Sequence, residues 1–81
     1  MSHKYEEYVA SARLASGQIM WLSRVAGPPR PYGPLDKFGR ATARFASEGE
    51  ARHAAEVLWK TDLGQDPIWQ VHTCEIRVVQ S

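Results

Sequence analysis

The strongest structural signal in the chain is a helix that begins at Ser47, because the residues on both sides of it read as strands and loops. Ser47 followed by Glu50 fits a capping box, in which the serine hydroxyl accepts a hydrogen bond from the third helical amide. Apolar residues at intervals of three and four form a single stripe, which comprises Ala51, Ala54, Ala55 and Leu58. Gly64 is a natural helix stop. We therefore predict a helix from Ser47 to about Lys60 that packs this stripe against a sheet.

Three tryptophans are distributed over the predicted elements. Trp59 lies about 100° around the helix from the apolar stripe, so we expect it at the helix edge. One interpretation is that Trp21, Trp59 and Trp69 together seal a small core between helix and sheet. The alternative is that one or more of them is exposed as an anchor for a partner, since tryptophan and arginine are enriched in interface hot spots.

Alternating side chains predict strands on both sides of the helix. Residues 8–15 and 18–25 alternate around Ser16-Gly17, which is the pattern of a β-hairpin. Residues 68–79 predict a long C-terminal strand whose apolar positions change phase midway. A β-bulge near His72-Thr73 would let both apolar sets face the same core.

Between the hairpin and the helix, residues 26–39 hold four of the five prolines, which remove amide donors and fix φ. We therefore expect an ordered loop that contains no helix and no central strand. A loop of this length is often functional in a compact domain. Residues 39–45 alternate and are a candidate for a short edge strand.

The predicted fold class is α+β, with one helix packed on one face of a small antiparallel sheet of three or four strands. A helical crossover tends to return the last strand to the same sheet. The first strand is then central, between its hairpin partner and the C-terminal strand. The 81 residues form one domain, in which we expect residues 1–6 to be a frayed N-terminus.

The charges are segregated, although their sum is only +1. A basic loop precedes an acidic helix, and the two segments either neutralise each other or one of them forms a contact patch. For a contact patch on the loop, the predicted partner-binding residues are Arg30, Tyr32, Lys37, Arg40 and Arg44. The alternative patch is the acidic helix face, which comprises Glu48, Glu56 and Asp62.

No motif in the sequence indicates catalysis, a cofactor or a metal site. His3, His53 and His72 lie in three different predicted elements, and none has a convincing second ligand at metal-binding spacing. Cys74 lies in the alternating apolar part of the last strand, so we expect a buried structural thiol rather than a nucleophile. We therefore predict a protein that is not an enzyme and needs no cofactor.

The location of the protein is also an expectation from composition. A single cysteine excludes an internal disulfide and fits a reducing cytosol. No apolar run approaches the roughly 20 residues of a membrane span, and residues 1–7 are too polar for a signal peptide. We expect a soluble, intracellular protein.

Two functional classes remain open. The first is a protein-interaction module that docks through the proline-rich basic loop and an exposed strand edge. The second is a small nucleic-acid-binding protein that uses Arg24 and the basic residues between Arg30 and Arg44, with Tyr32 stacking on bases. Overall charge disfavours the second class. We also expect a homodimer, because a long apolar C-terminal strand at a sheet edge invites pairing.

Four stretches carry a resemblance to a known group of proteins, namely WLSR at 21–24, ARFAS at 43–47, EGEAR at 48–52 and EIRVV at 75–79. In composition and order the chain resembles small uncharacterised proteins encoded by bacteriophages and prophages. Some such proteins are anti-CRISPR or other anti-defence factors. The resemblance implies an inhibitor that binds a host complex, such as a CRISPR effector, in the cytoplasm of a bacterium. The proline-rich loop departs from the pattern.

Overall fold

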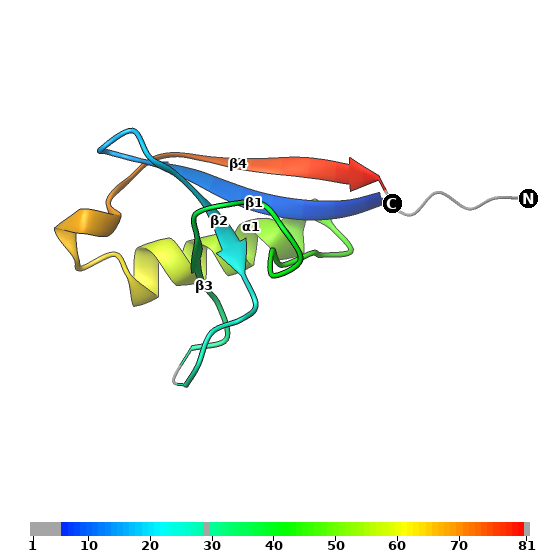
Figure 1. Ribbon diagram of the computed structural model, residues 1–81, viewed down its shortest axis with the longest axis horizontal. Helices are drawn as coiled ribbons and strands as arrows, with labels where there is room; N and C mark the ends of the chain where they lie inside the picture. The colour runs from blue at the N-terminus through cyan, green and yellow to red at the C-terminus, as the bar shows by residue number, and fades with distance from the viewer. Residues whose placement is uncertain (1–5, 29, 81) are drawn as a thin grey trace, which may run out of the picture.

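The computed structural model describes residues 6–28 and 30–80, and its elements follow one another in the order drawn in Figure 1. They are β1 (Glu6–Leu14), β2 (Ile19–Ser23), β3 (Gly33–Leu35), α1 (Glu48–Glu56), η1 (Val57–Asp62), η2 (Pro67–Trp69) and β4 (Val71–Gln80). Most of the predicted frayed N-terminus, residues 1–5, lies outside the described residues. Glu6 does not fray, because it begins β1 and pairs with Gln80.

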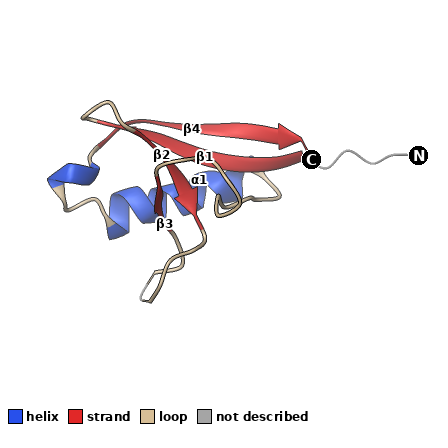
Figure 2. Ribbon diagram, viewed as in Figure 1, coloured by secondary structure: helices blue, strands red, loops and turns tan. Residues whose placement is uncertain are grey.

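The strands form one antiparallel sheet in the order β3-β2-β1-β4, with α1 along one face (Figure 2). This architecture confirms the predicted α+β class and the predicted place of the first strand between its hairpin partner and the C-terminal strand. Within the described residues, no helix has the length and apolar character needed to cross a membrane.

The start of α1 follows the predicted capping chemistry. Ser47 has extended backbone angles, φ −142° and ψ 156°, and its Oγ accepts a hydrogen bond of 3.2 Å from the Glu50 amide. Glu48 and Glu50 place negative charge in the first turn, where the helix dipole is positive. The stripe of Ala51, Ala54, Ala55 and Leu58 is buried, which confirms the predicted helix phase.

A π-helical turn, η1, extends the helix beyond Glu56 and changes which side chains face the sheet. The Leu63 amide donates to the Leu58 carbonyl at 2.8 Å, a hydrogen bond that spans five residues. The wider turn rotates less per residue than an α-helix, so Leu58 and Trp59 both face inward. Trp59 is only 4% exposed, and its predicted position at the helix edge is therefore wrong.

The predicted β-bulge is present at His72. Arg13 pairs with Thr73 while the next residue, Leu14, pairs with Val71, so His72 has no partner on β1. The extra residue returns Val71 to the core side of the sheet, where it packs against the buried cluster.

The C-terminal strand begins at Val71 rather than at residue 68 as the alternation predicted. Residues 67–69 form the short helix η2, because the Asp66 carboxylate accepts from the Ile68 amide at 3.0 Å and caps that turn. Trp69 still packs against the core from η2, as the sealing interpretation expected.

The third strand does not lie where the sequence predicted it. Within residues 39–45, Thr42 and Phe45 form only isolated bridges to β2 and β1. The strand is instead β3, inside the proline-rich segment 26–39 that was predicted to be a loop. Pro34 is tolerated there because β3 is the last strand of the sheet, where one amide can be missing without breaking a ladder.

Leu58 is fully buried between η1 and the sheet. We expect Leu58→Ala to lower the free energy of unfolding by about 2–5 kcal/mol through lost burial and a cavity. Glu56→Ala, an exposed position of the same helix, should change it by less than about 0.5 kcal/mol. Urea unfolding followed by circular dichroism measures both, and equal small effects would contradict the inward placement of Leu58.

Gly49 and Gly64, near the two ends of the helix, provide a matched pair of positions for testing substitution by alanine. A Cβ added at Gly64 would run into the Lys60 carbonyl, whereas a Cβ at Gly49 would meet no atom within 4 Å. We expect Gly64→Ala to destabilise the fold by more than about 1 kcal/mol. Gly49→Ala should stabilise the helix by about 0.5–1 kcal/mol. Thermal unfolding midpoints that move in the same direction would contradict the close approach at Gly64.

Candidate functional site

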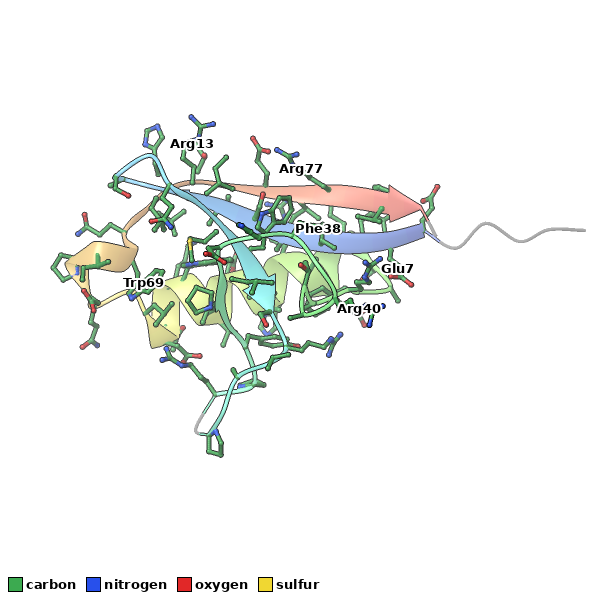
Figure 3. All side chains as sticks on the ribbon, viewed as in Figure 1. Glu7, Arg13, Phe38, Arg40, Trp69 and Arg77 are labelled. Atoms are coloured by element: carbon green, nitrogen blue, oxygen red, sulfur yellow. The ribbon has the colours of Figure 1, made fainter. Side chains whose placement is uncertain are left out.

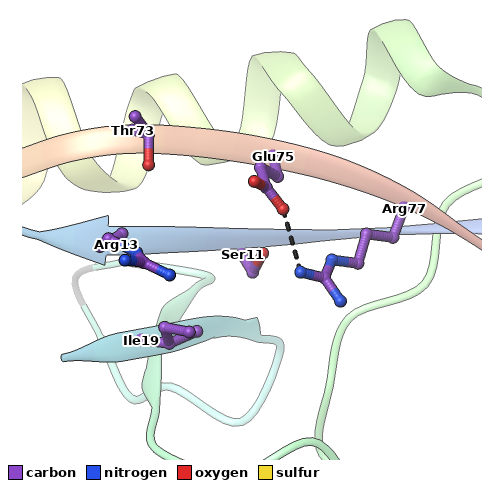
Figure 4. A pocket seen from close by; sticks show the side chains of 6 residues that line it. All are labelled: Ser11, Arg13, Ile19, Thr73, Glu75 and Arg77. Atoms are coloured by element: carbon purple, nitrogen blue, oxygen red, sulfur yellow. Dashed lines mark hydrogen bonds and ion pairs between the residues drawn. The ribbon is translucent and has the colours of Figure 1, made fainter. Parts of the chain in front are cut away.

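The face of the sheet opposite α1, here called the outer face, has no second layer among the described residues (Figure 2). Strand register places one set of side chains on it. Ser11 lies between Trp21 of β2 and Glu75 of β4, and Arg13 lies between Ile19 and Thr73. A small hollow lies here, seen from close by in Figure 4, and it is lined by Ser11, Arg13, Ile19, Thr73, Glu75 and Arg77.

A row of side chains, with an aromatic pair at its centre, an arginine on each side of the pair and a glutamate at each end, crosses the outer face, and we call it the ladder. Its members come from β4, β2, the loop after β3 and β1, and in spatial order they are Glu75, Arg77, Trp21, Phe38, Arg44 and Glu7. Figure 3 shows Phe38 between Arg77 and Glu7 over the sheet. Residues far apart in sequence are thus joined through contacts between neighbours.

The aromatic centre of the ladder is an edge-to-face pair. The rings of Trp21 and Phe38 have centroids 5.2 Å apart and an interplanar angle of 71°. The Arg77 guanidinium lies 5.7 Å from the Trp21 centroid, and that of Arg44 lies 5.6 Å from the Phe38 centroid. Both distances fall within the range of attractive cation–π contacts. The Trp21 ring is half-buried, whereas Phe38 is 44% exposed.

An ion pair lies at each end of the ladder. Arg77 contacts Glu75 at 3.0 Å, and Arg44 contacts Glu7 at 3.5 Å. These side chains are one-third to two-thirds exposed, so the pairs orient the arginines more than they stabilise the fold. Val9 lies beneath this row on the outer face and is only 1% exposed, which means that larger side chains close over β1.

The structure separates the predicted loop residues into two groups. Arg44 belongs to the ladder, and Lys37 and Arg40 are exposed on either side of Phe38 in sequence. Arg30 lies in the segment before β3, and Tyr32 is half-buried against the core.

Tyr32 belongs to a second aromatic group on the helix side of the sheet. Its ring lies 5.8 Å from that of Phe45, and the Arg24 guanidinium lies 4.9 Å from the Phe45 centroid and 5.9 Å from the Tyr32 centroid. Arg24 also donates to the Arg44 carbonyl at 2.8 Å. Through these contacts Arg24 holds the loop against the core. Only part of the Tyr32 side chain remains exposed to a partner.

The predicted acidic face lies on the helical layer, away from the ladder. Glu48 pairs with Arg52 at 3.2 Å one helical turn further along. Glu56 and Asp62 are exposed. Two charged surfaces therefore exist on opposite layers of the molecule, and the outer one is the only one of the two that combines arginine with aromatic rings among the described residues.

Cys74 is not the buried thiol that the alternation predicted, because its residue is exposed on β4. A strand at the sheet edge receives cover from one neighbour only, which accounts for the difference. The pKa of the thiol is nevertheless raised above its ordinary value, chiefly because partial burial disfavours the thiolate. Glu56 and Glu75 add to the rise, while Arg52 and Lys60 oppose it.

The remaining candidate ligands are dispersed. His3 lies outside the described residues, and His53 and His72 are exposed on α1 and at the bulge. Within residues 6–28 and 30–80, no three His, Cys, Asp or Glu side chains are grouped closely enough to hold a metal ion.

Searches against protein-family models, curated proteins and solved structures found no match to the chain.

Sequence reasoning missed the ladder, although one part of its signal was available. The alternation in β2 places Trp21 on the face opposite Met20 and Leu22, and this assignment is confirmed. Phe38 carries no such signal, because it lies in an irregular segment whose path over the sheet depends on the whole fold.

The raised pKa of Cys74 has a measurable consequence. At neutral pH the folded protein should hold less thiolate than the unfolded chain, and only the thiolate reacts with iodoacetamide. We expect the midpoint of the alkylation rate against pH to lie higher for the folded protein than for the same protein in urea. A midpoint at or below that of the unfolded control would contradict the role of burial.

Proposed function

We propose that this protein is a non-catalytic binding module that docks on another protein through the ladder on its outer face. The observation that carries the proposal is Phe38, an exposed aromatic ring held in a fixed position between Trp21 and Arg44. Tryptophan and arginine are the residue types most enriched at the energetic centres of protein interfaces, and aromatic residues are enriched across them.

The ladder is ordered before any partner arrives. Each ring contacts an arginine, and each arginine contacts a carboxylate, so the rotamers of these long side chains are already restricted. A side chain that is ordered in the free protein loses less entropy on binding, which raises affinity for a given contact area.

The stacking geometry favours a protein partner over a nucleic acid. A base that stacked on the ring face occupied by a guanidinium group would have to displace Arg77 from Trp21 or Arg44 from Phe38. Glu7 and Glu75 also pair with Arg44 and Arg77, so the ladder itself has no net positive charge to attract a phosphate backbone. Nucleic-acid binding through the loop of Arg30 to Arg44 is the alternative.

Charge around Phe38 indicates the chemistry of the partner surface. Within two residues of Phe38 in sequence, Lys37 and Arg40 are basic, Asp36 is acidic, and all three are exposed. Arg44 adds a guanidinium group next to the ring. A partner with acidic groups around an apolar pocket would therefore be attracted to this face and would receive the Phe38 ring in the pocket.

The resemblance to bacteriophage proteins extends this proposal to an inhibitor that blocks a host complex, with a CRISPR effector as one candidate. Occlusion by an aromatic docking face needs no catalytic group, so it is compatible with the prediction that the protein is not an enzyme. Both the inhibitor role and the absence of catalysis stay predictions.

The test is capture of partners from nuclease-treated extract of a bacterial host, with quantification by mass spectrometry. We expect Phe38→Ala to reduce the captured partner at least about tenfold, in line with the 1–2 kcal/mol or more expected at an interface hot spot. Ile68→Ala is the matched control, since Ile68 is 71% exposed on η2 and outside the ladder. Thermal unfolding confirms that both variants fold.

Charge reversals distinguish the surfaces that the sequence suggested. Changing Arg30, Lys37 and Arg40 to Glu tests the basic loop, and changing Glu48, Glu56 and Asp62 to Lys tests the acidic face. Loss of the partner only in the acidic-face variant, with Phe38→Ala binding normally, would overturn the proposal. Affinity for single-stranded DNA or RNA that falls steeply with salt would support the nucleic-acid alternative instead.

A further inference from the structure

The two edges of the sheet are built differently. The edge at β3 is only three residues long and contains Pro34, both of which discourage pairing with another strand. The edge at β4 is ten residues long and contains neither proline nor lysine. Beyond the bulge at His72 it is regular from Thr73 to Val79, and no described strand pairs with its outer side.

The hydrogen bonds of β1 show which main-chain groups of β4 are free. Tyr8 exchanges both of its main-chain hydrogen bonds with Phe45, at 2.9 Å each, on the side of β1 away from β4. The direction of the main-chain N–H and C=O groups alternates along an antiparallel strand. The main-chain groups of Val9 and Ser11 therefore point toward β4, where these residues pair with Arg77 and Glu75. The alternate residues Cys74, Ile76 and Val78 therefore direct their N–H and C=O groups to the open edge, where nothing in the described chain receives them.

We propose that a second copy of this chain pairs with β4 in antiparallel fashion, with the two-fold axis at Ile76. In an antiparallel pair, two residues that face each other must either both direct their main-chain hydrogen-bonding groups toward the other strand or both direct them away from it. This condition places the axis at a residue and not between two residues. With the axis at Ile76, Cys74 faces the partner's Val78. Ile76 then faces its own copy.

Charge selects Ile76 among the permitted axes. With the axis there, Glu75 faces the partner's Arg77, and Arg77 faces the partner's Glu75. Moving the axis by one residue, to Glu75 or to Arg77, would place that charged side chain opposite its own copy, which is destabilising. Glu75 and Arg77 would also lie at the non-hydrogen-bonded pairs, where side chains across two strands come closest.

Apolar contacts on the other face agree with this register. Val78 is 52% exposed although it projects toward the helix side, opposite Tyr8. Pairing about Ile76 covers it with the partner's Cys74 and extends the core across the axis. The result is a continuous eight-stranded sheet with both helices on one face, and it brings two ladders together on the other. The pairing does not depend on the function proposed for the ladder.

The first test uses charge variants at concentrations where the wild type is dimeric. We expect light scattering at high micromolar concentration to give twice the chain mass of 9.1 kDa. Glu75→Arg alone and Arg77→Glu alone should each remain monomeric, because four like charges would meet at the axis. An equimolar mixture of the two variants should form a heterodimer, since every facing pair is then of opposite charge. A wild-type protein that stays monomeric would overturn the proposal.

The second test reports the register directly. Val78→Cys would face the partner's Cys74 at a Cα separation of about 5.5 Å, within the range of about 4.4–6.8 Å that a disulfide allows. We expect oxidised glutathione to cross-link this variant into a covalent dimer. Wild type should not cross-link, and Val78→Cys combined with Cys74→Ser should not either. Cross-linking of the double variant would place the axis at Val78, cross-linking of wild type would place it at Cys74, and either result would overturn the proposed register.

Discussion

Close packing of α1 on β1 through alanine is the interaction on which the rest of the structure depends. Ala10 and Ala12 of the strand and Ala51, Ala54 and Ala55 of the helix are all at most 4% exposed. Alanine loses almost no side-chain entropy on burial and lets the helix lie close to the sheet. Each alanine buries little area, however, so larger side chains must close the core around them. These are chiefly Leu14, Leu22, Phe45, Leu58, Trp59 and Leu63.

A single helix covers one face of the sheet, and this constraint shapes the outer face. Val9 and Ser11 are buried there without a second layer, so the side chains around them have to provide the cover. The ladder meets this need by placing arginine stems and guanidinium groups over aromatic rings. The same arrangement leaves Phe38 44% exposed and in contact with Trp21 and Arg44, and the docking face that we propose is built on this ring.

Features that depend on neighbouring residues could be predicted from the sequence, whereas features that depend on distant ones could not. The cap at Ser47, the faces of β1 and the bulge at His72 follow from spacing along a few residues. The burial of Trp59, in contrast, depends on the π-turn and on the sheet beneath it, and neither is evident from the helical spacing alone. The candidate site could likewise be predicted only in part, because the sequence indicated Arg44 but not the Phe38 ring that it contacts.

The sequence by itself determined the fold class, because hydrophobic periodicity and capping residues act within one element and select helix or strand there. Only the tertiary structure decided which strands lie at the edges and what meets on the outer face. Edge placement depends on how the chain crosses over after α1, and it exposes Cys74, whose alternation alone indicated burial. The ladder joins residues from Glu7 to Arg77, and contacts over such separations exist only once the sheet has brought four segments together.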